Sequence, residues 1–345
     1  MRTLVLVAAV IVLGTAVTAG RGADDAAPPP ITEVPLTGTT GLRLVAASNP
    51  PLIVDVDTGN VSRVRGLDVR GNPVLSVLGA GGATIVWLER RTTRRSIPNA
   101  EISVVRSGSD RAARLTTAHQ VAPSADAGLW LKRHLDRYRC TLQEIALDGT
   151  ARRPLRSVPC VTRLTDAGGR ALLVRGEAVV DPGSRRVLAR TPLLLALAGD
   201  VLVTATGRQG SIVVTDLATG RSRELDYPSR ITGQGGFDEA VVDPTGKLVA
   251  LSFSDPAFGL TGTQVTDVWL LDTASGTLRH LPDMPAAVSL KRTSMAWAGD
   301  GRLVMLAEVG GRTLVAVWRP GQERLAVRPL RLPERTSGSD AFVAR

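Results

Sequence analysis

Apolar runs and turn-forming residues alternate along most of the chain, and the runs are rich in the valine and leucine expected of short β-strands. Seven of these runs lead into a turn that ends in glycine. The seven glycines are Gly59, Gly108, Gly149, Gly183, Gly220, Gly276 and Gly321. Their successive spacings are 49, 41, 34, 37, 56 and 45 residues, close to the ~40–50-residue repeat of β-propellers with four strands per blade. The pattern therefore predicts seven blades.

A second hairpin in each repeat is predicted by apolar runs that join through another glycine turn, as in "VVDPTGKLVALS" (241–252). The pair Gly246-Lys247 in this stretch also invites comparison with a phosphate-binding loop. Such a loop needs a glycine five positions before its Gly-Lys pair, a serine or threonine after the lysine, and a helix. Val241 and Leu248 occupy those two positions, and "LVALSF" alternates like a strand. Asp-Pro-Thr-Gly therefore predicts a hairpin turn instead of a nucleotide site.

Each repeat accordingly reads as four strands, which we call A to D in chain order. Tight turns join A to B and C to D, and longer loops join B to C and D to the next A. No helical periodicity is long enough for a helical domain. The predicted fold class is all-β: a seven-bladed β-propeller of four-stranded antiparallel blades, forming a single domain over residues 39–345.

The two ends of the chain are expected to meet, because the first repeat shows strands B, C and D clearly but no strand A. The C-terminal "SGSDAFVAR" (337–345) is similar to "GGFDEAVVD" (235–243), which opens the sixth repeat. We therefore predict that Ala341–Ala344 supplies strand A of the first blade, closing the ring and removing an exposed edge. The alternative is that "ITEVPL" (31–36) supplies it.

The N-terminus has the pattern of a secretory signal peptide over residues 1–19. A short basic start precedes an apolar run from Leu4 to Ala19, which ends in small or neutral residues. This run is shorter than the ~20 residues that comfortably span a bilayer, although an uncleaved membrane anchor is the alternative. Residues 20–38 read as a flexible, Pro-rich leader. The predicted location is extracytoplasmic, either secreted or associated with the cell envelope.

The chain has two cysteines, Cys140 and Cys160, and an exported protein meets oxidising conditions. The turn signal Asp148-Gly149 lies near the middle of the segment between them. Folding this segment as a hairpin brings the cysteines almost opposite each other, within reach of a disulfide. The alternative is two buried free thiols. We predict the disulfide.

These features together carry a family resemblance. "VVDPTGKLVALS", followed by "DVWLLDTASGTLRHLP" (267–282), resembles the blades of TolB-like and WD40-like extracytoplasmic propellers over roughly residues 40–345. The Trp-Asp dipeptide typical of WD40 blades is absent, which disfavours the cytoplasmic scaffold branch. The resemblance implies an exported propeller and assigns no activity.

The chain is basic, with 42 Lys and Arg against 32 Asp and Glu. Two stretches, "ERRTTRRSIPN" (89–99) and "KRHLDRYR" (132–139), read as B–C loops of the second and third blades. They contribute eight candidate binding residues: Arg90, Arg91, Arg94, Arg95, Lys132, Arg133, Arg137 and Arg139. Such a patch suits an anionic polymer, an acidic protein or a lipid surface; the alternative is a solvated, Arg-rich surface. Scarce aromatic residues disfavour nucleic acid.

Signals for catalysis or metal binding are sparse. His119, His134 and His280 stand on separate segments without ligand spacing, so we expect no metal and no cofactor. No Gly-x-Ser-x-Gly elbow is present. Strand A of every blade converges on the central channel, where residues from distant segments can meet. The candidates that we assign to the channel are Asp238, Glu239 and Asp267; their alternative role is to tie turns together.

The leading hypothesis is an exported, non-enzymatic binding or scaffold propeller. It would recognise a protein or an anionic envelope component through the face that carries the B–C and D–A loops. The alternative is an extracytoplasmic hydrolase or lyase with its site in the central channel. A third hypothesis is a sensor accessory to a membrane system, which would be favoured if the first 23 residues stay attached. We expect a monomer.

Overall fold

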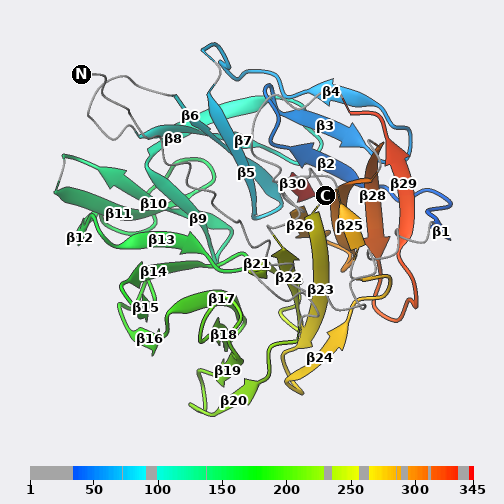
Figure 1. Cartoon of the computed structure of the whole chain (residues 1–345). Helices are drawn as coiled ribbons and strands as arrows, with labels where there is room; N and C mark the ends of the chain where they lie inside the picture. The colour runs from blue at the N-terminus through cyan, green and yellow to red at the C-terminus, as the bar shows by residue number, and fades with distance from the viewer. Residues whose placement is uncertain are drawn as a thin grey trace, which may run out of the picture.

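The computed structural model describes residues 34–71, 73–90, 99–136, 138–228, 235–255, 264–284, 286–288, 294–309, 312–332 and 342–345. Within these ranges the chain forms strands and turns without a helix, so the described residues offer no helix that could cross a membrane. The strands form seven sheets around one centre (Figure 1). The predicted seven-bladed propeller is confirmed. The predicted signal peptide and most of the leader lie outside the described residues.

Each blade is a four-stranded antiparallel sheet whose strand A lies nearest the centre and whose strand D lies at the rim. The first three blades consist of β30 (Phe342–Ala344), β2 (Arg43–Ala46), β3 (Leu52–Asp55) and β4 (Val61–Arg63); β5 (Val74–Ala80), β6 (Ala83–Glu89), β7 (Ala100–Val105) and β8 (Ala112–Ala118); and β9 (Gln120–Ser124), β10 (Gly128–His134), β11 (Arg139–Ala146) and β12 (Arg156–Pro159).

Blades four to seven continue in the same order, and two short strands extend the last two sheets. These blades consist of β13 (Arg163–Asp166), β14 (Ala171–Arg175), β15 (Ala178–Val180) and β16 (Val187–Arg190); β17 (Leu193–Ala198), β18 (Val201–Ala205), β19 (Ile212–Asp216) and β20 (Ser222–Leu225); β21 (Gly236–Val242), β22 (Leu248–Asp255), β23 (Gln264–Asp272) and β24 (Thr277–His280), with β25 (Ala286–Val288) on β23; and β26 (Ser294–Trp297), β27 (Leu303–Val309), β28 (Arg312–Trp318) and β29 (Ala326–Leu330), with β1 (Val34–Pro35) on β29.

The ring closes where the C-terminal strand β30 pairs with β2 and completes the first blade. Arg43 and Arg345 exchange both of their backbone hydrogen bonds, at 3.1 and 2.9 Å. The side chain of Phe342 is buried among residues of the first and last blades. The closure predicted for the C-terminus is therefore confirmed, and the alternative that residues 31–36 supply strand A is wrong. Val34 and Pro35 instead pair in parallel with β29, at the rim of the last blade.

Arg328 ties the N-terminal segment to the ring. Its guanidinium donates to the carbonyls of Leu36 and Gly38, and to the Asp57 carboxylate at 2.8 Å. Asp57 also accepts the backbone N–H groups of Thr40 and Gly41. Desolvation raises the pKa of Asp57, but these donors outweigh it and hold the pKa well below its usual range. The last blade thus binds both the segment before the first blade and the strand that completes it.

The predicted turns form as the sequence indicates. In the hairpin between β21 and β22, the Asp243 carboxylate accepts the backbone N–H groups of Thr245 and Leu248, and Gly246 adopts a positive φ of 72°. This arrangement is a tight turn between two strands, as expected. All seven predicted glycines lie between strands C and D. In the fourth blade the positive φ falls on Arg185, at 65°, instead of Gly183.

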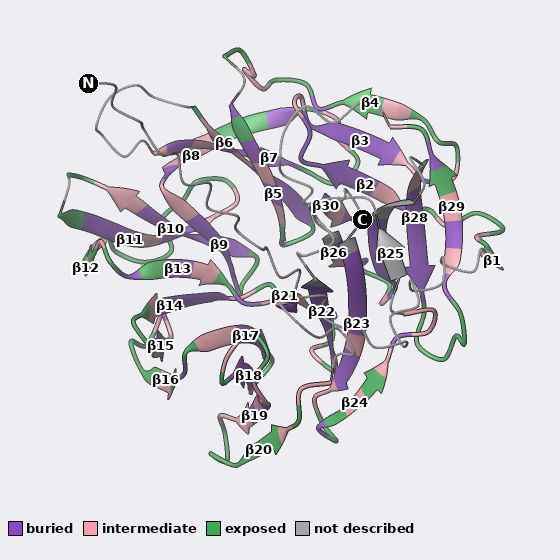
Figure 2. Cartoon of the chain, viewed as in Figure 1, coloured by how far each residue is buried: buried purple, intermediate pink, exposed green. Residues whose placement is uncertain are grey.

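Buried side chains gather between neighbouring blades and not around one central point (Figure 2). Leu270 of the sixth blade, for example, shares an apolar cluster with Met305 and Trp318 of the seventh. Each blade is therefore stabilised by burying both of its faces against its neighbours.

The predicted disulfide between Cys140 and Cys160 is present, with a Cα–Cα separation of 5.1 Å. The cysteines are not directly opposite each other: Cys140 pairs with Val158, and Cys160 follows the end of β12. The bridge therefore links strand C of the third blade to the connection that leads into the fourth.

Candidate functional site: the central channel

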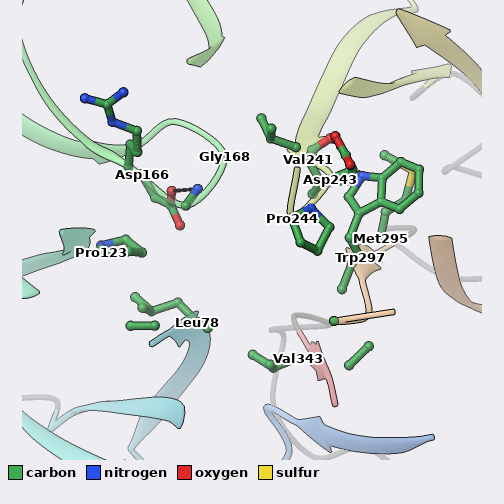
Figure 3. Close-up of a pocket in the computed structure, with 18 of the residues that line it drawn as sticks. Leu78, Pro123, Asp166, Gly168, Val241, Asp243, Pro244, Met295, Trp297 and Val343 are labelled. Carbon is green, nitrogen blue, oxygen red and sulfur yellow. Dashed lines mark hydrogen bonds between the residues drawn. The ribbon is translucent and has the colours of Figure 1, made fainter. Parts of the chain in front are cut away.

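The inner strands of all seven blades enclose a cavity of about 1200 Å³ along the axis of the ring (Figure 3). Its walls combine apolar side chains with carboxylates, and tight A–B turns surround one end. The apolar part includes Leu78, Leu195, Phe237, Trp297 and Val343. Ligand pockets likewise combine a mainly apolar wall with a few polar groups.

Asp166 is the last residue of β13 and stands at the turn end of the channel. The backbone N–H of Gly169 donates to its carboxylate at 2.7 Å. Solvent reaches the side chain, yet the surrounding blades partly desolvate it. This desolvation raises the pKa of Asp166 to about 6, against the opposing effect of the N–H groups of Gly169 and Gly168. The carboxylate is therefore charged at neutral pH and gains a proton under mildly acidic conditions.

Gly168 shows how closely the turn of the fourth blade approaches the sixth. Its φ is 82°, and a Cβ built there would lie 2.1 Å from Cγ2 of Val242. Only glycine fits this combination of backbone shape and contact. The turn that carries Asp166 is thus packed against β21, which carries the next two carboxylates.

Asp238 and Glu239 line the cavity from β21. The pairing of β21 with β22 shifts register between Phe237 and Glu239, leaving Asp238 as the extra residue of a β-bulge. Bulges re-aim side chains and are common beside functional sites. The Asp238 residue is exposed, while the Glu239 carboxylate accepts the backbone N–H of Met295 at 3.1 Å.

The carboxylates lie at different levels of the channel. All seven inner strands run from the long-loop face to the A–B turn face, because every blade has the same strand order. Asp166 ends its strand, whereas Asp238 and Glu239 are the third and fourth of the seven residues of β21. A ligand that meets both levels must therefore lie along the axis.

The remaining charged residues of the lining are engaged locally. Asp243 ties its own turn, as described above. Arg170 donates to the carbonyl of Gly199, and Arg345 donates to the carbonyls of Val105 and Arg106. The described lining includes no histidine and no cysteine.

Asp267, the third residue that the sequence assigned to the channel, is placed elsewhere. It lies on β23, the third strand of the sixth blade, is fully buried, and is absent from the described lining of the cavity. Its carboxylate lies 2.6 Å from Nε2 of His280 and accepts the indole N–H of Trp269 at 3.0 Å. The register explains this cluster, because Trp269 pairs with His280 and Asp267 is the next residue on the same face.

The basic candidates divide into three groups. Four of them lie outside the described residues: Arg91, Arg94, Arg95 and Arg137. Arg90 and Arg139 are exposed, and each forms an ion pair with a nearby aspartate, Asp68 at 3.0 Å and Asp136 respectively. Arg90 also donates to the carbonyls of Asp68 and Arg70.

Lys132 and Arg133 belong to β10 and not to a loop, because this strand continues to His134. Lys132 is only 2% exposed and donates to the carbonyl of Cys160 at 2.9 Å. Desolvation lowers the pKa of Lys132. The Arg133 guanidinium donates hydrogen bonds to the carbonyl of Thr117 and to the side chains of Thr116 and Gln143. Lys132 therefore adds no charge to the surface, and Arg133 is half-buried.

Comparison with known proteins supports the fold and goes no further. No family model matches the chain, and no curated protein matches it significantly. A protein from Lactobacillus plantarum is similar in structure at 13% identity and a TM-score of 0.51, covering 88% of this chain and 99% of that one. The β-propeller domain of the Trilobed protease from Pyrococcus furiosus gives 10% identity and a TM-score of 0.52, covering 86% and 96%.

Prolyl oligopeptidase B from Galerina marginata is also similar, at 10% identity and a TM-score of 0.51, over 83% of this chain and 48% of that one. At these identities the likeness shows a shared propeller fold. Membership of the TolB-like or WD40-like families stays a prediction, and function has to be argued from the site.

Proposed function

We propose that this protein is an exported binding propeller whose central channel receives a cationic, partly apolar segment of its ligand. The observation that carries the proposal is the charge of the cavity. The chain as a whole carries a formal net charge of +10, yet in the channel lining four carboxylates, Asp166, Asp238, Glu239 and Asp243, stand against two arginines, Arg170 and Arg345. A recess whose lining carries an excess of one sign of charge attracts ligands of the opposite sign.

The chemistry of the wall defines the ligand class. Carboxylates form strong, charge-assisted hydrogen bonds with guanidinium and ammonium groups. The apolar wall between them suits aliphatic or aromatic groups. A peptide segment with alternating basic and apolar side chains satisfies both requirements, and in extended form it follows the channel axis at about 3.3 Å per residue.

The disulfide supports the extracytoplasmic location, because such bridges persist in oxidising compartments. The basic loops are a weaker candidate for the recognition surface than the channel. The four described members of that group are paired with neighbouring groups or lie inside the blade, so we place recognition in the channel.

Catalysis in the channel is the second candidate function, and Asp166 is the reason to keep it. A carboxylate with a pKa of about 6 is suited to proton transfer near neutral pH. Hydrolase or lyase activity that disappears in Asp166→Asn would favour this candidate over binding alone.

The proposal can be tested with two fluorescein-labelled peptides, Arg-Leu-Arg-Leu-Arg and Glu-Leu-Glu-Leu-Glu, titrated with the purified protein at pH 7.5 and low salt. Fluorescence anisotropy measures Kd. We expect only the basic peptide to bind, and we expect the double variant Asp166→Asn/Asp238→Asn to bind at least tenfold more weakly. Asp148→Asn, in an exposed C–D turn, is the matched control and should leave Kd unchanged.

Two results would count against the proposal. Equal binding of the basic peptide by the wild type, the double variant and the control would remove the channel from recognition. Preferential binding of the acidic peptide would instead point to the basic loops.

A further inference from the structure

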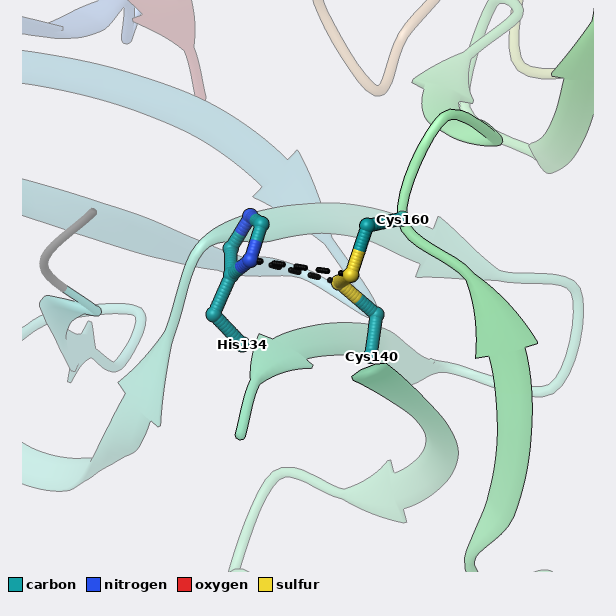
Figure 4. A group of neighbouring side chains, drawn as sticks. All are labelled: His134, Cys140 and Cys160. Carbon is teal, nitrogen blue, oxygen red and sulfur yellow. Dashed lines mark hydrogen bonds between the residues drawn. A yellow bond between two sulfur atoms is a disulfide. The ribbon is translucent and has the colours of Figure 1, made fainter. Parts of the chain in front are cut away.

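Figure 4 shows a compact group of potential metal ligands in the third blade. None of its residues belongs to the described lining of the channel. It comprises His134, Cys140 and Cys160. Nδ1 of His134 lies 3.3 Å from Sγ of Cys140 and 3.7 Å from Sγ of Cys160. Cys140 is buried, whereas His134 and Cys160 are partly exposed, so solvent reaches the group from one side.

The local fold fixes all three residues. His134 ends β10 and pairs directly with Cys140 at the start of β11. The Asn99 side chain binds the His134 backbone at both its N–H and its carbonyl. Buried Lys132 donates to the carbonyl of Cys160 and holds that residue beside the other two. The arrangement therefore does not depend on the disulfide bond alone.

The two nitrogen–sulfur distances suit a metal site. In tetrahedral zinc sites, Zn–S is about 2.3 Å and Zn–N about 2.0–2.1 Å, which places a sulfur and a nitrogen ligand roughly 3.6 Å apart. The two separations from His134 Nδ1 bracket this value. The two sulfurs, which are bonded now, would have to separate to roughly 3.8 Å. Cys160 follows the end of a strand at the blade rim, where rotation of its side chain can supply this movement.

We infer that the third blade holds a Zn²⁺ site in the reduced protein, with Cys140, Cys160 and His134 as ligands. The oxidised protein carries the disulfide instead, so the site exists in only one of two redox states. His119 stands beside it, with its ring edge-on to His134 and the centroids 4.2 Å apart. His119 is not among the residues whose ligand atoms are grouped here, so the fourth position is left to water.

The chemistry balances as thiol–disulfide exchange followed by metal binding. A dithiol reductant attacks the Cys140–Cys160 bond, gives its two electrons and two protons to the cysteines, and becomes a disulfide itself. Zn²⁺ then replaces the two thiol protons, which are released to solvent, and binds the neutral His134 through Nδ1.

The test uses the purified protein, reduced with a phosphine that does not bind Zn²⁺ strongly and then titrated with Co²⁺ as a spectroscopic probe. We expect a thiolate-to-cobalt charge-transfer band that saturates at one equivalent and is abolished by competing Zn²⁺. The oxidised protein should show no such band. His134→Ala should weaken Co²⁺ binding at least tenfold, as loss of one ligand requires.

Far-UV circular dichroism at each step tests whether the reduced protein and the variant remain folded. Alkylation provides a second measurement that does not depend on any variant: Zn²⁺ should slow the reaction of the reduced wild type with iodoacetamide at least tenfold. A folded, reduced protein without a charge-transfer band would overturn the inference. Unchanged affinity in His134→Ala, or alkylation at the same rate with and without Zn²⁺, would do so as well.

Discussion

Closure of the ring by β30 makes a quantitative prediction about stability. Phe342→Ala removes the largest side chain of this strand, which is only 6% exposed and packs against both the first and the last blade. Truncating a buried phenylalanine costs about 3–5 kcal/mol, because transfer energy is lost and a cavity remains. At about 2 °C per kcal/mol, the lower end for large domains, the expected drop in Tm is roughly 6–10 °C.

Deleting residues 342–345 should cost more than Phe342→Ala alone. The deletion also removes the two backbone hydrogen bonds between Arg43 and Arg345, worth about 1 kcal/mol each, and those of Arg345 to the second blade. It further leaves β2 as an unpaired edge, which promotes aggregation. We expect a lower Tm than that of Phe342→Ala and a concentration-dependent loss of soluble protein.

Differential scanning calorimetry measures the Tm of each variant. Leu135→Ala is the matched control, because Leu135 is a large apolar residue that is 61% exposed, and its loss should change stability by less than about 0.5 kcal/mol. The closure would be refuted if the Tm of Phe342→Ala or of the deletion lay within about 1 °C of that of the control. This difference corresponds to about 0.5 kcal/mol.

Closure can also be trapped covalently. Because Arg43 and Arg345 exchange both backbone hydrogen bonds, the next pair, Leu44 and Ala344, is a non-hydrogen-bonded pair. Such pairs have Cα atoms about 4.5 Å apart, within the range of a disulfide. Leu44→Cys/Ala344→Cys should therefore oxidise in air and migrate faster on a non-reducing gel. A product in which both introduced cysteines stay reduced would contradict the register between β2 and β30.

Three further predictions concern the site, the native disulfide and the turn beside the channel. Binding of the basic peptide should weaken as pH falls through about 6, because Asp166 gains a proton, and this pH dependence should be absent in Asp166→Asn; anisotropy titrations between pH 7.5 and 5 measure it. Cys140→Ala/Cys160→Ala should lower the free energy of unfolding in urea by about 3 kcal/mol, since the bridge spans 20 positions of sequence, and a loss below about 0.5 kcal/mol would show that the bridge constrains little. Gly168→Ala should lower the free energy of unfolding in urea by at least about 1 kcal/mol, because a Cβ would meet Val242 at a positive φ; a stability equal to the wild type would contradict the close approach of the two blades.

The repeat and its turns were predictable because their signals are local. Each C–D turn is marked by a glycine that follows an apolar strand, and Gly246 marks its A–B turn in the same way. The closing strand was predictable because residues 337–345 repeat the pattern of a sequence that opens another blade. The extra strand β1 has no such signal, because Val34 and Pro35 pair with β29, a strand nearly three hundred residues later in the sequence.

The site was less predictable because it depends on which strands face the axis. Asp238 and Glu239 were assigned to the channel from their place in an opening strand. Asp166 was missed, since "TDAGGR" reads simply as a turn and its raised pKa comes from blades that are distant in sequence. Asp267 lies on a third strand, away from the axis. Lys132 was assigned to a loop because charge suggested solvent, whereas β10 extends past it and its side chain is buried.

The central claim is that the ligand enters the channel, and a neutral obstruction tests it most directly. Gly299 lines the cavity, has no positive φ, and would place a Cβ in open space, so a side chain can be attached there without backbone strain or a close contact at its Cβ. The measurement is the Kd of the basic peptide for Gly299→Trp and for the control Gly299→Ala. We predict at least fivefold weaker binding for the tryptophan variant, an unchanged Kd for the alanine variant, and the wild-type Tm for both. Wild-type affinity in a folded Gly299→Trp protein would contradict the claim and place the ligand outside the channel.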